Sequence, residues 1–118
     1  MKQLQIFEPA MCCNTGFSGV GVDTELIRIS AVIKALAKRD IKLERFNLSK
    51  EPQEFINNTE VNYYINTVGI DNLPVTTLDG KIVLEGRYPS NEEIAKYLEV
   101  PVEALGETPK ILGVTIEN

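Results

Sequence analysis

The feature that most constrains the fold is a predicted β-hairpin in the second half of the chain. Two apolar runs, at 75–78 and 81–85, flank the dipeptide Asp79-Gly80. A two-residue Asp-Gly link between such runs is the strongest short-range hairpin signal, and it predicts a type I′ turn. Any sheet that this chain forms must therefore accommodate at least one antiparallel pair of strands.

The first half of the chain predicts a strand, a helix and a second strand. A short apolar run at 4–7 is stopped by Pro9, and a loop with several glycines is expected over 10–22. Apolar residues then recur at helical spacing over 26–37, and the alternating segment 41–46 predicts a strand. Two strands joined through a helix favour a parallel crossover.

Three further helices are indicated by capping residues and by apolar periodicity. Ser49 is a predicted cap for a short helix, and an apolar stripe over 59–68 predicts another helix that ends before Gly69. Ser90 and Glu93 have the spacing of a capping box, which marks the start of the last helix. The resulting order is strand, helix, strand, two helices, hairpin and helix.

This order predicts an α/β fold of the thioredoxin-like kind, in which a central four-stranded mixed sheet is flanked by helices. In that plan a cis proline precedes the third strand and faces the loop after the first strand. We therefore expect the peptide bond between Leu73 and Pro74 to be cis, as a structural cis-proline. Residues 1–106 are expected to form the thioredoxin-like domain, and residues 107–118 a flexible C-terminal tail.

Composition restricts the classes of function. A chain of 118 residues is one domain by length, and no apolar run is long enough to span a bilayer, so no membrane partner is expected. Residues 1–6 lack the apolar stretch of a signal peptide, which predicts a cytoplasmic protein with reduced thiols. The net charge of −5 and the lack of a strong basic stripe weaken the case for nucleic-acid binding.

Cys12 and Cys13 are the only cysteines in the chain, which has no histidine. Thioredoxin-type enzymes use two cysteines separated by two residues, and here no second thiol stands at that distance from either cysteine. Neighbouring thiols in a glycine-containing loop instead suit a soft, thiophilic ion such as trivalent arsenic or antimony. No other motif predicts catalysis, so we expect a binding protein and not an enzyme.

Two other interpretations of the dithiol remain open. A structural zinc site normally needs four cysteine or histidine ligands, of which this chain offers two, so copper(I) is the stronger metal competitor. The cysteines would otherwise be small buried hydrophobic residues, as free cysteines often are. A polar loop bounded by Pro9 and by glycines is a poor place to bury them.

The cysteines lie within the segment Glu8-Pro9-Ala10-Met11-Cys12-Cys13-Asn14-Thr15-Gly16, which resembles the amino-terminal signature of the ArsD family of arsenical-resistance metallochaperones and trans-acting repressors. The similarity continues in the same order through four more segments. These are Glu44-Arg45-Phe46-Asn47-Leu48, Asn72-Leu73-Pro74, Leu78-Asp79-Gly80 and Gly86-Arg87-Tyr88-Pro89. The paired cysteines combined with Gly-Arg-Tyr-Pro make the resemblance specific.

The resemblance implies a homodimeric, thioredoxin-like protein that carries As(III) or Sb(III) as cargo and has no permanent cofactor. Members of the family are understood to hold the metalloid with three cysteine thiolates, to pass it to the ATPase subunit of an efflux pump, and to repress their own operon at its operator DNA. Cys12 and Cys13 match the first two metal ligands, whereas Ser18 stands at the third position. A hydroxyl cannot simply replace a thiolate, so we expect weaker binding than at a three-thiolate site.

Ser18 leaves three explanations open. The chain is a two-thiol variant that takes a third sulfur from glutathione or a partner subunit, or it carries an engineered replacement of cysteine, or it has lost chaperone activity and kept regulation. The leading hypothesis is a metalloid metallochaperone with a further repressor role. The alternatives are a thioredoxin-like thiol oxidoreductase and a DNA-binding repressor only. Arg87 and Tyr88 are interpreted as either structural or partner-facing.

Overall fold

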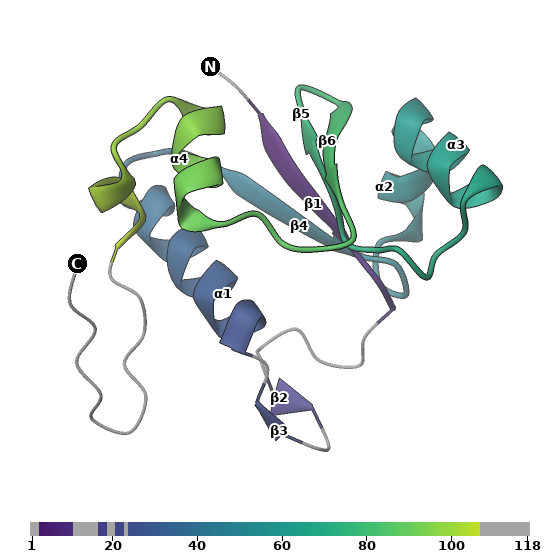
Figure 1. The fold of residues 1–118 in the computed structure, drawn as a ribbon, viewed down its shortest axis with the longest axis horizontal. Coiled ribbons are helices and arrows are strands. Elements are labelled where there is room, and N and C mark those ends of the chain that lie inside the picture. The colour runs from purple at the N-terminus through teal and green to yellow at the C-terminus, as the bar shows by residue number, and fades with distance from the viewer. Residues whose placement is uncertain (1–2, 11–16, 19–20, 23, 107–118) are drawn as a thin grey trace.

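A four-stranded sheet lies at the centre of the structure, a computed structural model that describes residues 3–10, 17–18, 21–22 and 24–106. The strands are β1 (Leu4–Glu8), β4 (Leu43–Asn47), β5 (Val75–Leu78) and β6 (Lys81–Glu85), in the spatial order β4-β1-β5-β6. The pair of β1 with β4 is parallel, and the other two pairs are antiparallel. The sheet is therefore mixed, as predicted (Figure 1).

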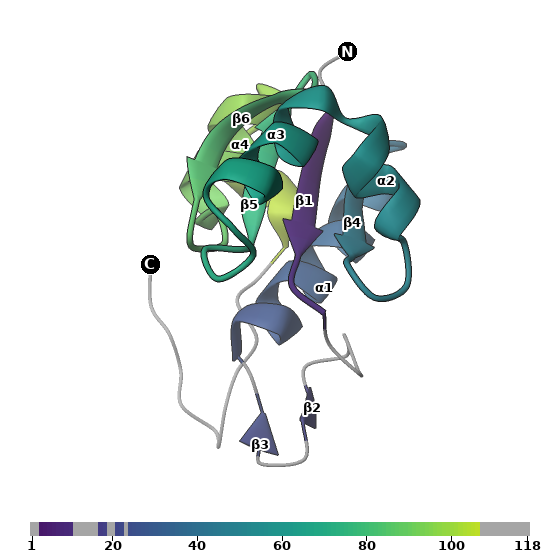
Figure 2. The same ribbon diagram turned by 90° about the vertical axis from the view of Figure 1, so that its right-hand side faces the viewer.

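Helices cover both faces of this sheet. On one face lie α1 (Thr24–Ala37), α4 (Asn91–Leu98) and a short 3₁₀ helix, Val102–Leu105; on the other lie α2 (Pro52–Asn57) and α3 (Thr59–Thr67) (Figures 1 and 2). Successive side chains of β1 alternate between the two buried clusters, because Leu4 and Ile6 pack towards α1 and Phe7 packs towards α2 and α3. The architecture is the predicted thioredoxin-like α/β plan.

The local turn signals of the sequence are confirmed. Leu78 pairs with Lys81 across Asp79 and Gly80, whose φ values of 53° and 90° are both positive, as a type I′ turn requires. The peptide bond between Leu73 and Pro74 is cis. The hairpin therefore has the predicted turn, and the cis bond lies at the predicted place, directly before β5.

The predicted helix ends also agree with the structure at two places. Gly69 follows the C-terminal cap of α3 and has a φ of 107°. Ser90 and Glu93 form the reciprocal hydrogen bonds of a capping box at the start of α4. None of the helices in the described part of the chain is both long and apolar enough to cross a membrane.

The cap predicted at Ser49 is wrong, because Asn47 holds that residue in a turn at the end of β4. The Asn47 Oδ1 atom accepts hydrogen bonds from the backbone N–H and the hydroxyl of Ser49, at 2.9 and 2.7 Å. Glu51 is the N-cap of α2, and its carboxylate accepts a hydrogen bond from the Asn47 N–H at 2.8 Å. Local bonds between side chains and backbone of this kind compete with helix capping.

The segment predicted as a loop over 10–22 contains a short hairpin. It consists of β2 (Phe17–Ser18) and β3 (Gly21–Val22), which pair antiparallel with Ser18 opposite Gly21. Strands of two residues are too short for an alternating pattern to identify them in a sequence. Residues 11–16, which include both cysteines, and the predicted tail at 107–118 lie outside the described residues.

Candidate functional site

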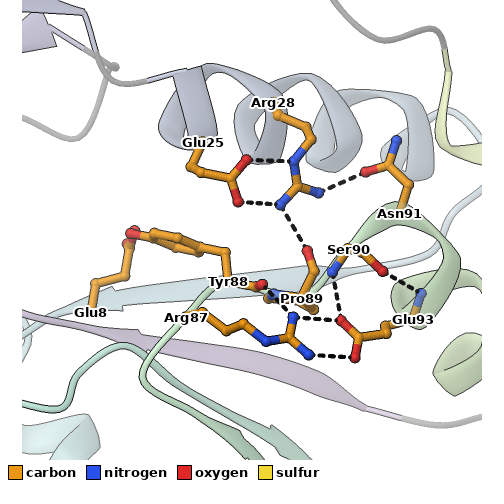
Figure 3. A network of polar contacts seen from close by, with 9 residues as sticks. All are labelled: Glu8, Glu25, Arg28, Arg87, Tyr88, Pro89, Ser90, Asn91 and Glu93. Carbon is orange, nitrogen blue, oxygen red and sulfur yellow. Dashed lines mark hydrogen bonds and ion pairs between the residues drawn. The ribbon is translucent and has the colours of Figure 1, made fainter.

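Glu8, the last residue of β1, carries a carboxylate that is 0% exposed. Arg45 of β4 donates two hydrogen bonds to it, from Nε to Oε1 at 3.1 Å and from Nη2 to Oε2 at 2.7 Å. The hydroxyl of Tyr88 donates a third hydrogen bond, to Oε2 (Figure 3). A carboxylate that is shielded from solvent needs such hydrogen-bond partners, because an unpaired buried charge is strongly destabilising. Three distant segments of the chain therefore meet at this strand end.

The register of the sheet places Arg45 beside Glu8. Arg45 lies opposite Ile6, and residues two apart along a strand face the same side of the sheet. On that side Arg45 also donates from Nη1 to the hydroxyl oxygen of Ser30 in α1, at 3.1 Å. Only 10% of the Arg45 side chain is exposed, so solvent screens this ion pair weakly.

Arg28, near the start of α1, makes a second set of contacts at the same end of the molecule. Its guanidinium donates from Nη2 to the carbonyl oxygen of Pro89 at 2.8 Å and from Nη1 to Oδ1 of Asn91 at 2.7 Å. It also donates to both carboxylate oxygens of Glu25, at 2.7 and 3.0 Å. Hydrogen bonding by Arg28 is the main reason that the pKa of Glu25 lies below its ordinary value.

The segment between β6 and α4, together with the first residue of α4, supplies partners for both sets of contacts. It begins at Gly86, whose N–H donates to the carbonyl oxygen of Pro74 at 2.9 Å. Gly86 has a φ of 81°, a conformation that glycine adopts without steric cost. The cis proline and the Gly-Arg-Tyr-Pro segment are therefore in direct contact in the structure.

Arg87 fixes the other end of this segment to α4. Its Nη1 and Nη2 atoms donate to the two oxygens of Glu93, at 2.8 Å each, and Glu93 also accepts a hydrogen bond from the Ser90 N–H at 2.8 Å. These bonds, with that of Arg87 the largest cause, lower the pKa of Glu93 from 4.5 to about 2. Glu93 is therefore an anion over the whole physiological range of pH.

We expect the variant Arg87→Gln to lose part of the stability that depends on ionised Glu93. Because the pKa of Glu93 is lowered on folding, its contribution is present above about pH 4.5 and is lost as the pH falls towards 2. The free energy of unfolding in urea should therefore differ most between the variant and the unaltered chain near pH 7, and less near pH 3. A difference that is the same at both pH values would contradict this linkage.

The residues predicted from the sequence fall in two groups. Pro74 lies in the described part, and its carbonyl oxygen binds Gly86. Cys12 and Cys13 lie outside the described residues, and of Ser18 only the backbone is described, in β2. No cluster of three or more His, Cys, Asp or Glu side chains suitable for a metal ion occurs within the described ranges. The cysteine ligands therefore stay a prediction.

Sequence reasoning missed the roles of Glu8 and Arg28, and it left Tyr88 open between a structural and a partner-facing role. Two signals were available for this group. Glu8 is a charged residue at the end of an otherwise mainly apolar strand, and Glu8, Arg45 and Tyr88 all belong to the segments that carry the family resemblance. Arg28 gives no such signal, because helical spacing alone predicts a solvent-facing side chain, whereas it is only 15% exposed.

Comparisons with known sequences cover almost the whole chain. Residues 1–113 match the family model described as arsenical resistance operon protein ArsD. Two proteins of Escherichia coli, both named arsenical resistance operon trans-acting repressor ArsD, are 39% and 41% identical to this chain, over 92% and 90% of it and 91% and 88% of their own lengths. A putative arsenical resistance operon repressor ArsD of Halobacterium salinarum is 32% identical, over 84% of this chain and 93% of its own.

A solved structure agrees with these sequence matches. It is the crystal structure of an arsenical resistance operon trans-acting repressor from Bacteroides vulgatus, which is 41% identical in sequence and superimposes with a TM-score of 0.76. The superposition covers 82% of this chain and 92% of that one. Sequence and fold thus match over most of the length of both proteins, and the chain belongs to the ArsD family.

Proposed function

We propose that this chain binds trivalent arsenic or antimony through Cys12 and Cys13 and delivers it to the ATPase subunit of an efflux pump. The observation that supports this most is membership of the ArsD family together with an adjacent pair of thiols shortly after β1. Thiolates are the ligands that soft metals and metalloids prefer. Delivery would take place on the cytoplasmic side of the membrane, where thiols stay reduced.

The chain itself has no cysteine at the third ligand position, where Ser18 stands. Trivalent arsenic accepts three sulfurs, and the hydroxyl of Ser18 is a harder and much less acidic donor than a thiol. We propose that glutathione, or a thiol of a partner subunit, supplies the third sulfur. A thiol must lose its proton to bind, so the affinity for arsenite should rise with pH up to the thiol pKa.

The variant Ser18→Cys should bind arsenite at least tenfold more tightly than the unaltered chain, because a third tethered thiolate adds to the effective concentration of ligands. The affinity of this variant for arsenite should also no longer depend on glutathione. Titration of the reduced chain and the variant with arsenite, with and without glutathione and with free thiols counted at each point, measures both effects. Uptake of one arsenite that masks both thiols of the unaltered chain would support the proposal.

Two results would oppose the proposal. If arsenite masks neither thiol of the fully reduced chain, the dithiol is not a metalloid site. If the unaltered chain and Ser18→Cys bind arsenite equally, the third position does not contribute to binding. Turnover of a disulfide substrate would favour the thiol oxidoreductase instead, although the relatives are named as repressors and not as enzymes.

A repressor role on the arsenical resistance operon is the second candidate function, and the names of the curated relatives favour it. Because the net charge of the chain is −5, operator binding would have to use a local basic surface, and it should weaken as the salt concentration rises. A gel-shift experiment with the operon's own promoter tests this. A salt-sensitive complex that arsenite releases would support the role, and no complex at low salt would oppose it.

A further inference from the structure

The outer surface of α2, α3 and the residues that follow α3 exposes several large apolar side chains. These two helices cover one face of the sheet and are turned towards the viewer in Figure 2. Of the six large apolar side chains that are exposed in the described residues, four lie here, and each is between 50% and 70% exposed: Ile56, Tyr63, Val68 and Ile70. A group of exposed apolar side chains on one surface is typical of an interaction site, whereas single ones are not.

The same surface carries almost no charge. Glu60 is the only charged residue among residues 55–70, although a quarter of the whole chain is charged. The Glu60 carboxylate accepts a hydrogen bond from the backbone N–H of Ile82 in β6, at 3.0 Å. Depletion of charge, together with an exposed tyrosine, distinguishes the centre of a protein–protein interface from the rest of a protein surface. The exposed side of residues 55–70, here called the α2–α3 surface, therefore has the composition of an interface.

The polar groups of the α2–α3 surface can pair with copies of themselves. Apart from Glu60, its exposed polar side chains are amides and hydroxyls, which belong to Asn57, Thr59, Tyr63, Asn66 and Thr67. Amides and hydroxyls both donate and accept hydrogen bonds, whereas lysine and arginine only donate and carboxylates only accept. A twofold-symmetric interface brings a patch against the same patch of a second copy. The chemistry of this surface therefore suits a second copy of the chain.

Charge and the sheet edges restrict where else two copies could meet. Each copy carries a net charge of −5, so acidic surfaces of two copies repel each other. At the β6 edge of the sheet, Glu60 already binds the backbone N–H of Ile82. At the β4 edge, Glu51 binds the backbone N–H of Asn47. Both edges are thus partly closed to an added strand, whereas the α2–α3 surface meets neither obstacle.

We propose that the α2–α3 surface is the interface of a twofold-symmetric dimer of this chain, with Tyr63 as an anchor. Tyr63 is 70% exposed and lies two positions after the buried Val61, which places the two side chains on opposite sides of α3. Tyrosine side chains at such positions often supply much of the binding energy of an interface. The inference does not rest on the proposed metalloid chemistry, because no thiol takes part in this contact.

Sedimentation velocity of the full-length chain over a range of concentrations tests the proposal. The buffer is kept reducing, because a disulfide between two chains would also give a dimer. We expect the unaltered chain to sediment as a dimer. Tyr63→Glu should weaken dimerisation by about 100-fold, because each dimer loses two anchors and gains two facing carboxylates. Asn66→Asp keeps the size of the side chain but leaves a group that only accepts, and should weaken dimerisation by about tenfold.

Val102→Glu is the matched control. Val102 is 39% exposed and lies in the 3₁₀ helix on the other face of the sheet, so this variant adds the same charge away from the α2–α3 surface. Its dimerisation should equal that of the unaltered chain. All three substituted side chains are exposed or half-buried, so each variant should fold, and circular dichroism checks this.

Three results would overturn the inference. An unaltered chain that stays monomeric at every concentration would leave the α2–α3 surface to an unlike partner. A dimer that both Tyr63→Glu and Asn66→Asp leave intact would show that two copies meet at another surface. An equally large loss of dimer in Val102→Glu would show a general effect of added negative charge. None of these results bears on arsenite binding, so the proposed function stands or fails separately.

Discussion

Replacing Arg45 with methionine should lower the free energy of unfolding by about 3–5 kcal/mol, the usual loss when one partner of a buried ion pair is removed. Methionine keeps most of the length and apolar contact of the side chain but donates no hydrogen bond to Glu8. Of the hydrogen bonds that the described residues make to the Glu8 carboxylate, which is 0% exposed, the one from Tyr88 would then remain. Urea unfolding near neutral pH measures the loss.

Two further variants separate the effect of charge from that of side-chain volume. Lys42→Met removes a cation that is 81% exposed and paired with Glu44, so it should change stability little. The double variant Glu8→Gln with Arg45→Met has no buried charge left at this site and should recover part of the lost stability. If Arg45→Met destabilises the chain no more than Lys42→Met does, the ion pair at the end of β1 has no structural role.

Replacing either cysteine with serine should weaken arsenite binding by about 10²- to 10⁴-fold, because the remaining thiolate loses the gain from a second tethered ligand. Cys12→Ser and Cys13→Ser should behave alike, since both thiolates are proposed ligands. Isothermal titration of the reduced chains with arsenite measures the change. Circular dichroism of each variant checks that the substitution leaves the fold intact.

Ser18→Ala is the matched control for the cysteine variants. Its hydroxyl is not a proposed ligand, so its removal should leave the affinity for arsenite unchanged. A loss with Ser18→Ala as large as that with Cys13→Ser would show that oxygen at this position takes part in binding. Full affinity in either single-cysteine variant would show that the two thiols do not act together.

The parts of the fold that the sequence predicted well depend on neighbouring residues. Asp79 and Gly80 specify their turn through positive φ values, and Ser90 and Glu93 bond to each other's backbone within one helical turn. The cis peptide before β5 followed from the element order. Each of these signals can be recognised from a few adjacent residues or from the sequence of elements.

The contacts that were not predicted join residues far apart in the sequence. Glu8 and Tyr88 are separated by 80 positions, and Glu8 and Arg45 by 37. Their contact depends on the register of β1 with β4 and on the path from β6 to α4, neither of which a local pattern fixes. The prediction of a helix cap at Ser49 was wrong for a local reason. The Ser49 hydroxyl donates a hydrogen bond to the Asn47 side chain and is not used to cap the helix.

Arsenic K-edge X-ray absorption of the reduced full-length chain, loaded with one equivalent of arsenite, tests most directly whether Cys12 and Cys13 hold one metalloid atom. The spectrum reports how many sulfur and oxygen neighbours the arsenic has. We predict two sulfur neighbours and one oxygen in the protein alone, and three sulfur neighbours after glutathione is added. An arsenic atom that keeps only oxygen neighbours in the presence of both reduced thiols would contradict a metalloid site at this dithiol.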